Sequence, residues 1–471
     1  MVFTHFDGGV RDVLIHVIFF GVEDRVDGYC AGAVWRPPPG KKGAWLLDRL
    51  ILVGGDGLRV RRLGGTRAGE IGLTRFLRNP AVTVEAMVAE AARRTAERCA
   101  GRRVLVIQDT TVVRAAERRG QGQFLHPALV VDEDEGAVLG LADACFLLRD
   151  GSESKASTRH AAFEDKESVR WLRGVQAADR VCAAAERVTV IADRESDVFE
   201  VFAQRPQGVE LLIRAKHDRA MGDGGERLWA RADAAPEAGR AQVELPARPG
   251  RRARTATVAV RKLTVEPARP GRGGQGKHVP SGVRLTLVDV REVDPPAGVE
   301  PLHWRLLTTL PAGDAAEAFA IVELYRRRWA IEQLFRTLKT AGFDISAVEI
   351  ADDDARQRLV MAALVAAVTV QQLVHARDGT QGPSPLRPLT DAFEASDLPL
   401  LKAFTAKLEG KTQRQKNPHP EDSLAYASWV CARLGGWTGY YGKPGPAVML
   451  SGWLHFQAAK DGVSTLASHN V

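Results

Sequence analysis

The sequence is poor in cysteine and has no C-x-x-C pair. Its five cysteines lie far apart in 471 residues, at Cys30, Cys99, Cys145, Cys182 and Cys431. An odd and scattered set of thiols does not build a disulfide framework. We therefore expect reduced, mostly buried cysteines in a cytoplasmic protein.

Membrane signals and histidine-based metal motifs are also missing. The apolar run from Val13 to Val22 falls well short of the roughly 20 residues that span a bilayer. No A-x-A-like cleavage site follows it, so it does not resemble a signal peptide, and we expect no membrane association. The histidines show no spacing typical of a metal site, and we expect His126, His160 and His217 to be ordinary surface or core residues.

What is present is a globular composition with a small excess of positive charge. The chain is 45% hydrophobic and 26% charged, close to the averages of folded soluble proteins. Its 65 Lys and Arg against 58 Asp and Glu give a net charge of +7, which suits a polyanionic partner without requiring one. At 471 residues two or three domains are expected, because single cores rarely exceed roughly 250–300 residues.

Two short apolar runs each end in an aspartate. Residues 104–108 lead into Asp109, and residues 188–192 lead into Asp193. Continuous apolar runs of this length are typical of strands buried on both faces of a central sheet. Open α/β sheets bind their ligands at the carboxyl ends of strands. The sequence therefore predicts that Asp109 and Asp193 lie together at one edge of a sheet.

The remaining segments alternate between helical and extended patterns, which predicts an α/β fold. Helices are expected over residues 80–99 with Thr83 as N-cap, around 164–186, from Asp314 to Thr340, and over 354–377. Extended segments are expected as a hairpin at 128–132 and 138–148, a strand at 209–215, and a β-rich insertion at about 229–300. The Gly- and Pro-rich block 267–282 is expected to be the solvated, flexible tip of this insertion rather than a DNA-reading arm.

One predicted helix carries a stripe of polar side chains, which consists of Tyr325, Arg328, Glu332 and Lys339. At about 100° per residue, all four positions fall within roughly 60° of one another. An adjoining apolar stripe indicates that the polar stripe borders the core. Taken alone, the pattern also fits a solvated Arg328–Glu332 pair worth ~0.3–0.5 kcal/mol.

The three acids Asp109, Asp193 and Glu332 would repel one another without a cation. Oxygen ligands of this kind select Mg²⁺ or Mn²⁺. Two such ions about 3.5–4 Å apart can activate a water or a 3′-hydroxyl for in-line attack on a phosphodiester. The sequence therefore predicts a divalent metal site that performs phosphoryl transfer on a nucleic acid.

The same residues carry a resemblance to a known family. The run Tyr325-x2-Arg328-x3-Glu332-x6-Lys339 is similar to the YREK signature of bacterial cut-and-paste insertion-sequence transposases, the class that includes transposon Five. Further blocks resemble that family in the same order: QDTT at 108–111, DKESVRWL at 165–172, ADRESD at 192–197, IRAKHDR at 213–219, HWRLLTT at 303–309, and SLAY at 423–426 with ARLGGW at 432–437. The resemblance covers about residues 74–460.

The resemblance implies a fold and a function. The implied fold is a ribonuclease-H-like mixed sheet flanked by helices, interrupted by the β-rich insertion, with helical N-terminal and C-terminal regions. The implied divisions are an unplaced leader and linker at 1–43, a DNA-recognition head at 44–100, a catalytic core at 101–378 and a dimerisation region at 379–471. The implied protein is a DNA transposase with endonuclease activity that nicks transposon ends, forms hairpins and joins the ends to target DNA.

The resemblance also implies partners and site residues. Mg²⁺ is the implied cofactor, with Mn²⁺ as a substitute, and Asp109, Asp193 and Glu332 are the implied catalytic and metal-holding triad. We expect a homodimer on double-stranded inverted-repeat ends in the cytoplasm, associated with the nucleoid. The implied DNA-binding residues are Tyr325, Arg328, Lys339, Trp304, Arg214, Lys216 and Arg219. Trp304 matches a tryptophan that stacks on a flipped base, with a place in the core as the alternative. An exposed, solubilising face is the alternative for residues 214–219.

The chain departs from the family pattern at its N-terminal side. The linking motif is present as RFLRNP at 75–80, but residues 45–73 are glycine-rich and shorter than the family's head. Each internal glycine costs a helix about 1 kcal/mol, which points to a divergent or truncated head. Two alternatives to an active transposase remain. One is an inactive DNA-binding relic or inhibitor of a full-length relative, and the other is a structure-selective nuclease on the same fold.

Overall fold

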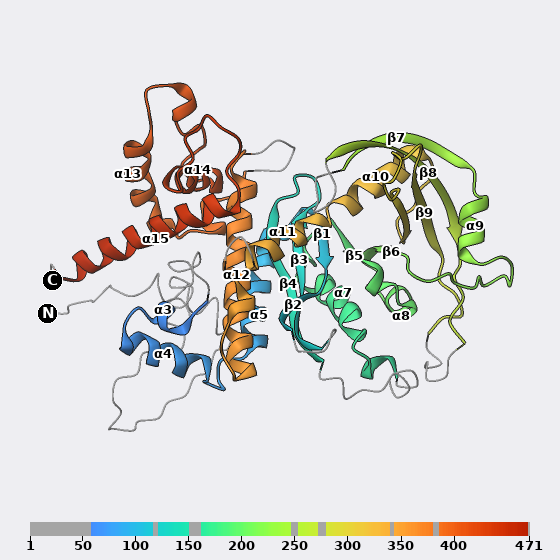
Figure 1. Ribbon diagram of the computed structural model, residues 1–471, viewed down its shortest axis with the longest axis horizontal. Coiled ribbons are helices and arrows are strands. Elements are labelled where there is room, and N and C mark those ends of the chain that lie inside the picture. The colour runs from blue at the N-terminus through green and yellow to red at the C-terminus, as the bar shows by residue number, and fades with distance from the viewer. Residues whose placement is uncertain are drawn as a thin grey trace.

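The computed structural model describes residues 58–115, 121–149, 162–245, 253–271, 279–339, 343–379 and 386–469. The expected leader at 1–43 and the residues Cys30 and His160 lie outside these ranges. A large mixed sheet flanked by helices forms the body of the protein (Figure 1). This arrangement agrees with the predicted α/β class.

Ten strands build this sheet, in the order β2-β3-β1-β5-β6-β10-β9-β8-β7, with β4 paired to β3. Their bounds are β1 Arg103–Gln108, β2 Thr111–Ala115, β3 Gly122–Asp132, β4 Val138–Arg149, β5 Arg187–Ala192, β6 Val209–Arg214, β7 Glu237–Leu245, β8 Arg254–Val265, β9 Leu285–Glu292 and β10 His303–Thr308. Strands β1, β5 and β6 run parallel, whereas the other pairs are antiparallel. The two predicted strands that precede Asp109 and Asp193 are confirmed.

The strands of residues 229–300 extend the same sheet. Strand β10 pairs on one side with β6 and on the other with β9, which joins β7, β8 and β9 to the central strands. Residues 272–278 of the expected flexible tip lie outside the described part of the chain. Isolated bridges pair Met221 with Pro267 and Ala268 with Gly282 at the base of this block. The expectation that the block is a solvated, flexible tip stays a prediction.

Helices cover the sheet and build both ends of the described chain (Figure 1). Their bounds are α3 Val60–Gly64, α4 Arg67–Leu77, α5 Val84–Cys99, α7 Val169–Val181, α8 Phe199–Ala203, α9 Leu228–Ala234, α10 Ala315–Arg326, α11 Trp329–Leu338, α12 Asp353–Ala376, α13 Leu398–Leu408, α14 Leu424–Leu434 and α15 Pro446–His469. Helix α5 agrees with the sequence prediction down to its cap, because the Thr83 hydroxyl accepts a hydrogen bond from Ala86 N at 3.1 Å.

Helix α12 is the central helix of the protein. In Figure 1 it stands between the sheet on one side and the C-terminal helices α13 to α15 on the other, with α3 and α4 near one end. By length and composition it could span a membrane, but 83% of its most apolar window is buried inside the protein. Side chains along it reach several layers: Arg358 donates to Leu77 O, Gln372 donates to Leu139 O, and Leu373 O accepts from the Ser428 hydroxyl. The most apolar helix is thus a core element.

The helix expected from Asp314 to Thr340 is interrupted. Helix α10 ends at Arg326, and α11 begins at Trp329. Between them, Arg327 N bonds to Leu324 O and Arg328 N to Tyr325 O, which is the tighter three-residue spacing of a 3₁₀ turn. The single continuous stripe predicted from regular helical spacing is therefore wrong. The turn instead makes Arg328 the N-cap residue of a new helix.

Glycines in the N-terminal head serve close packing of two helices. A Cβ placed on Gly69 would lie 2.0 Å from Gly64 O, and a Cβ placed on Gly64 would lie 2.4 Å from Glu70 N. Helix α4 forms despite its internal glycines and is capped by Thr66, whose hydroxyl accepts from Gly69 N at 3.1 Å. These glycines are therefore required by the contact between α3 and α4, and they do not show that the head is damaged.

We predict that Gly69→Ala loosens this head although alanine favours a helix by about 1 kcal/mol. The added methyl group collides with the Gly64 carbonyl, and overpacking of this kind costs roughly 1–3 kcal/mol. Hydrogen exchange of residues 58–77 should become faster in the variant. Gly462→Ala in α15 is the matched control, because a Cβ there meets nothing within 4 Å. Unchanged exchange in Gly69→Ala would contradict the packing role.

Candidate active site

Strand pairing brings two aspartates to the same edge of the sheet. Strands β1 and β5 are parallel, and their register pairs Gln108 with Ala192 as the last residues of the two strands. Asp109 and Asp193 are the next residue in each case. Parallel neighbours of this kind lie about 4.8 Å apart in the hydrogen-bonding direction. The register thus places the two aspartates side by side at the carboxyl ends of their strands, as the sequence predicts.

Each aspartate is oriented by the backbone that follows it. Asp109 Oδ1 accepts from Thr110 N at 2.7 Å. Asp193 Oδ1 accepts from Glu195 N at 2.9 Å and caps the short 3₁₀ turn Arg194–Ser196. These local hydrogen bonds use one oxygen of each carboxylate and leave the other oxygen for further partners.

Arg328 links Asp109 to the third acid. Its Nη1 donates to Asp109 Oδ2 at 2.6 Å, and its Nη2 donates to Glu332 Oε1 at 3.3 Å. The 3₁₀ turn before α11 positions this side chain, which is only 18% exposed, so the pair is not the solvated surface pair considered above. The three predicted acids are therefore close enough for their charges to interact, and the Arg328 guanidinium lies between Asp109 and Glu332.

The protonation of Asp109 reflects these surroundings. Burial raises its pKa from 3.8 to about 6. The Arg328 charge and the hydrogen bond from Thr110 N act against that rise, whereas the negative charges of Asp193 and Glu332 add to it. The net rise means that a single guanidinium does not compensate fully for taking this carboxylate out of water beside two others.

The ligand chemistry suits a hard divalent cation, but the side chains are not arranged as a preformed metal cage. Within the described ranges, no group of three or more His, Cys, Asp or Glu is placed to hold a metal ion. Arg328 supplies positive charge between Asp109 and Glu332 instead. The carboxylate oxygens themselves are the ligand type that Mg²⁺ and Mn²⁺ take. In the structure Arg328 thus occupies the place beside Asp109 Oδ2 where a cation would add its positive charge.

A cavity of about 430 Å³ lies beside the acids and is lined in part by aromatic side chains. Trp304 from β10 and Tyr325 from α10 meet edge to face, with ring centroids 5.6 Å apart. Trp304 is half-buried and packs against the core, and its role toward a flipped base stays a prediction. Trp329 also lines this cavity, although the sequence analysis did not single it out. Its position directly after Arg328 is the signal that could have identified it.

The predicted basic residues differ in their burial and in their partners. Arg214 lines the aromatic cavity, donates to His303 O at 3.0 Å, and has a pKa lowered by burial. Lys339 follows α11 as its C-cap residue, and burial lowers its pKa while the charge of Glu332 opposes that shift. Lys216 is exposed. Arg219, in contrast, is buried and forms an ion pair with the fully buried Asp197. Arg219 is thus a structural counter-ion rather than a residue on an open face.

His126 supports the strand end that carries Asp109. Its Nδ1 lies 2.9 Å from the Thr110 hydroxyl and its Nε2 lies 3.1 Å from Gln108 Oε1. Because the Gln108 oxygen can only accept, Nε2 carries the proton and Nδ1 accepts from Thr110. Trp171 packs edge to face on the ring at 4.5 Å. The expectation of an ordinary histidine is incomplete, since this core histidine braces the residues on either side of Asp109.

We predict that Asp109→Asn stabilises the protein near neutral pH. The folded pKa of Asp109 lies above its ordinary value, so between 3.8 and about 6 the folded state binds more protons than the unfolded state, and stability falls as the pH rises through this window. Asparagine removes that cost, which is on the order of 2–3 kcal/mol above the window. Urea unfolding should show the gain at about pH 7 and its decline toward about pH 4. An equal effect at both values would contradict the raised pKa.

Comparison with known families agrees with this geometry. A family model described as the transposase DDE domain matches residues 101–369. The match spans more than half of the chain, and it includes β1, β5, α11 and the cavity beside them. The three acids, the two tryptophans and Arg328 all fall inside it. The chain belongs to the transposase DDE domain family.

Proposed function

We propose that this protein is a DNA transposase of the bacterial YREK class that nicks transposon ends, forms hairpins and joins the freed ends to target DNA. The observation that carries the proposal is the in-register parallel pairing of β1 and β5, which sets Asp109 beside Asp193 opposite Glu332. Family membership supports DNA as the substrate and phosphodiester chemistry as the activity.

Asp109, Asp193 and Glu332 are proposed to hold Mg²⁺, with Mn²⁺ as a substitute. A bound divalent ion lowers the pKa of an attacking water or 3′-hydroxyl and stabilises the leaving oxygen. The chain's own part is to orient the carboxylates, which Thr110 N and Glu195 N do by holding one oxygen of each aspartate. Arg328 keeps the acids together until the ion and the DNA phosphates take over its charge role.

The proposed reaction has four steps on the same acids. Water attacks the phosphorus at the transposon end, and the 3′-oxygen of that strand leaves. The freed 3′-hydroxyl loses its proton and attacks a phosphorus of the opposite strand, which closes a hairpin and expels the 3′-oxygen of the flanking DNA. Water then hydrolyses the hairpin and restores the 3′-hydroxyl, which attacks a phosphorus of the target DNA and expels the target strand's 3′-oxygen. We propose that a homodimer on paired ends performs these steps, with the C-terminal helices contributing to assembly.

We propose that six side chains bind the DNA, namely Tyr325, Arg328, Lys339, Trp304, Arg214 and Lys216. Arg328 and Arg214 offer forked donors to phosphate oxygens, and Lys339 and Lys216 offer point charges. We leave Arg219 out of this set because its guanidinium is buried against Asp197. Trp304, with Trp329 on the same cavity wall, provides an aromatic surface for an unstacked base, which recovers ~1–3 kcal/mol by stacking.

We predict that Asp193→Asn abolishes Mn²⁺-dependent joining of pre-cut ends, taken from the DNA that flanks the gene. Loss of one carboxylate should slow the reaction by at least about 10³-fold while DNA binding is retained. Product analysis on denaturing gels measures joined strands from pre-cut ends, and it measures cleavage and hairpins from uncut ends in a parallel reaction. Asp223→Asn is the matched control, because Asp223 is exposed and paired with Arg231 in the loop before α9.

The products distinguish the proposal from its alternatives. Binding without cleavage in the unaltered protein would favour the relic or inhibitor. Cut ends without hairpins or joined strands would favour a structure-selective nuclease. Full activity in Asp193→Asn would refute the role of the acid triad.

We predict that Arg328→Met tightens Mn²⁺ binding at about pH 8 and changes it little at about pH 5. At the higher pH the ion no longer competes with a guanidinium for Asp109. Loss of the guanidinium also raises the pKa of Asp109 above its present value of about 6, so at the lower pH stronger competition from protons offsets that gain. Calorimetric titration of the DNA-free protein with Mn²⁺ measures both effects.

The matched control is the neighbouring Arg327→Met, since Arg327 donates to Asp134 O and to none of the three acids in the structure as described. This control should bind Mn²⁺ like the unaltered protein at both pH values. If Arg328→Met did the same, the exchange of the guanidinium for a metal would be contradicted.

A further inference from the structure

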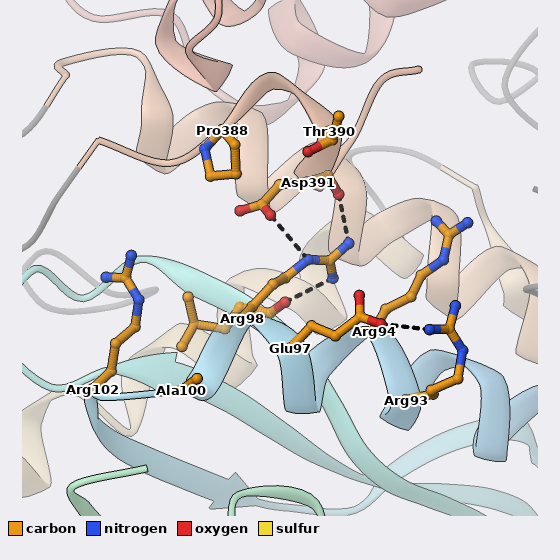
Figure 2. Close-up of a pocket in the computed structure, with 10 residues that line it drawn as sticks. Arg93, Arg94, Glu97, Arg98, Ala100, Arg102, Pro388, Thr390 and Asp391 are labelled. Atoms are coloured by element: carbon orange, nitrogen blue, oxygen red, sulfur yellow. Dashed lines mark hydrogen bonds and ion pairs between the residues drawn. The ribbon is translucent and has the colours of Figure 1, made fainter. Parts of the chain in front are cut away.

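A second cavity, of about 660 Å³, lies at the opposite end of β1 from the acids. Figure 2 shows arginines converging on it from α5 and from the start of β1, with residues 388–391 forming the facing wall. It is lined by Arg93, Arg94, Glu97, Arg98, Ala100, Arg102, Leu139, Pro388, Thr390 and Asp391. Its size lies within the roughly 300–1,000 Å³ range of ligand sites. Four guanidiniums against two carboxylates give the lining an excess of positive charge.

Two of these arginines are occupied with structural contacts. Arg98 donates to Leu139 O at 2.9 Å and to Asp391 O at 2.6 Å, which fastens the facing wall to α5. Arg93 bonds to Glu90 through Nε and Nη2, each at 3.0 Å, and also to Glu97. Burial lowers the pKa of Arg98 to about 10. These two residues shape the cavity, and their donors are largely used.

The other two arginines keep donors for a ligand. Arg102 uses Nη1 on the buried Asp132 at 2.9 Å, which anchors the guanidinium from behind. Arg94 makes an ion pair with Glu90 at 3.6 Å, and its guanidinium donates no hydrogen bond to any residue that the structure describes. Its side chain is only 23% exposed. In Figure 2 the guanidiniums of Arg94 and Arg102 stand on either side of the bonded Arg98. A guanidinium has five N–H donors, so Arg94 and Arg102 can each bind an anion and still keep the ion pair that holds them in place.

We infer that Arg94 and Arg102 form a second DNA contact that binds a backbone phosphate away from the candidate active site. The inference rests on the proposed action on DNA. Planar guanidiniums match phosphate oxygens, and the ion-pair partners behind them hold them in place before the phosphate arrives. The length of β1 separates this contact from the acids by about 20 Å. That distance is less than one turn of duplex DNA, roughly 34 Å, so one bound duplex can reach both.

The inference is tested by the salt dependence of DNA binding by the full chain. Fluorescence anisotropy with a labelled duplex of arbitrary sequence is measured in EDTA, between about 50 and 200 mM NaCl. Each phosphate contact contributes about −0.9 to the slope of log K against log salt concentration. The double variant Arg94→Gln, Arg102→Gln is expected to flatten the slope by about 1 and to weaken binding roughly 10-fold or more.

Controls separate a DNA contact from a structural role. Arg240→Gln removes an exposed arginine of β7 that is paired with Glu237, and it should leave the slope unchanged. The charge-preserving variant Arg94→Lys, Arg102→Lys should restore most of the slope, which also answers the case in which the glutamine variant folds poorly. A slope in the glutamine variant equal to that of the unaltered protein would overturn the inference, as would an equal loss in Arg240→Gln.

Free phosphate is the competing source of the same chemistry. Inorganic phosphate is therefore titrated at constant ionic strength. Suppose that phosphate binds the unaltered protein more tightly than the glutamine variant, while the salt dependence of DNA binding has the same slope for both proteins. The cavity then binds free phosphate, and the DNA contact is refuted. Failure of the unaltered protein to bind any DNA would instead refute the proposed function itself. Because EDTA removes divalent metal, the result does not depend on catalysis.

Discussion

The register between β1 and β5 is the constraint on which the candidate site depends. Both strands are buried, with Leu105, Val106, Ile107 and Ile191 fully covered, so a slip of one residue would turn apolar side chains toward the wrong face. The same slip would separate Asp109 from Asp193 by about 3.3 Å along the sheet. Core packing therefore fixes the distance between two acids that would otherwise move apart by repulsion.

Arg328 completes this arrangement at an energetic cost. It holds Asp109 and Glu332 together, yet the pKa of Asp109 still rises to about 6. The folded protein thus keeps an acid that water would ionise more readily. Sites with a function commonly retain such unfavourable electrostatics, because a ligand of opposite charge relieves them on binding. The break between α10 and α11 belongs to the same arrangement, since it turns Arg328 toward the acids.

Local pattern was sufficient to predict β1, β5 and β6, the hairpin of β3 and β4, helix α5 with its Thr83 cap, and the ends that carry Asp109 and Asp193. Each depends on residues close together in the sequence. Contacts between distant segments were not predictable in this way. The burial of Arg219 against Asp197, the continuation of the sheet from β6 through β10, and the bond from Arg98 to Asp391 all depend on how elements pack. The 3₁₀ turn at Arg328 also has no signal in helical spacing. The roles assigned to the site residues stay predictions.

The central claim is that three acids share a divalent metal once Arg328 gives up Asp109. Anomalous diffraction from crystals of the full chain grown with Mn²⁺ and a DNA end tests it most directly. The account predicts manganese peaks in contact with the carboxylates of Asp109, Asp193 and Glu332, with two ions about 3.5–4 Å apart and the Arg328 guanidinium moved off Asp109. Manganese bound elsewhere, with Arg328 still joined to Asp109 and Glu332 while DNA occupies the site, would contradict it.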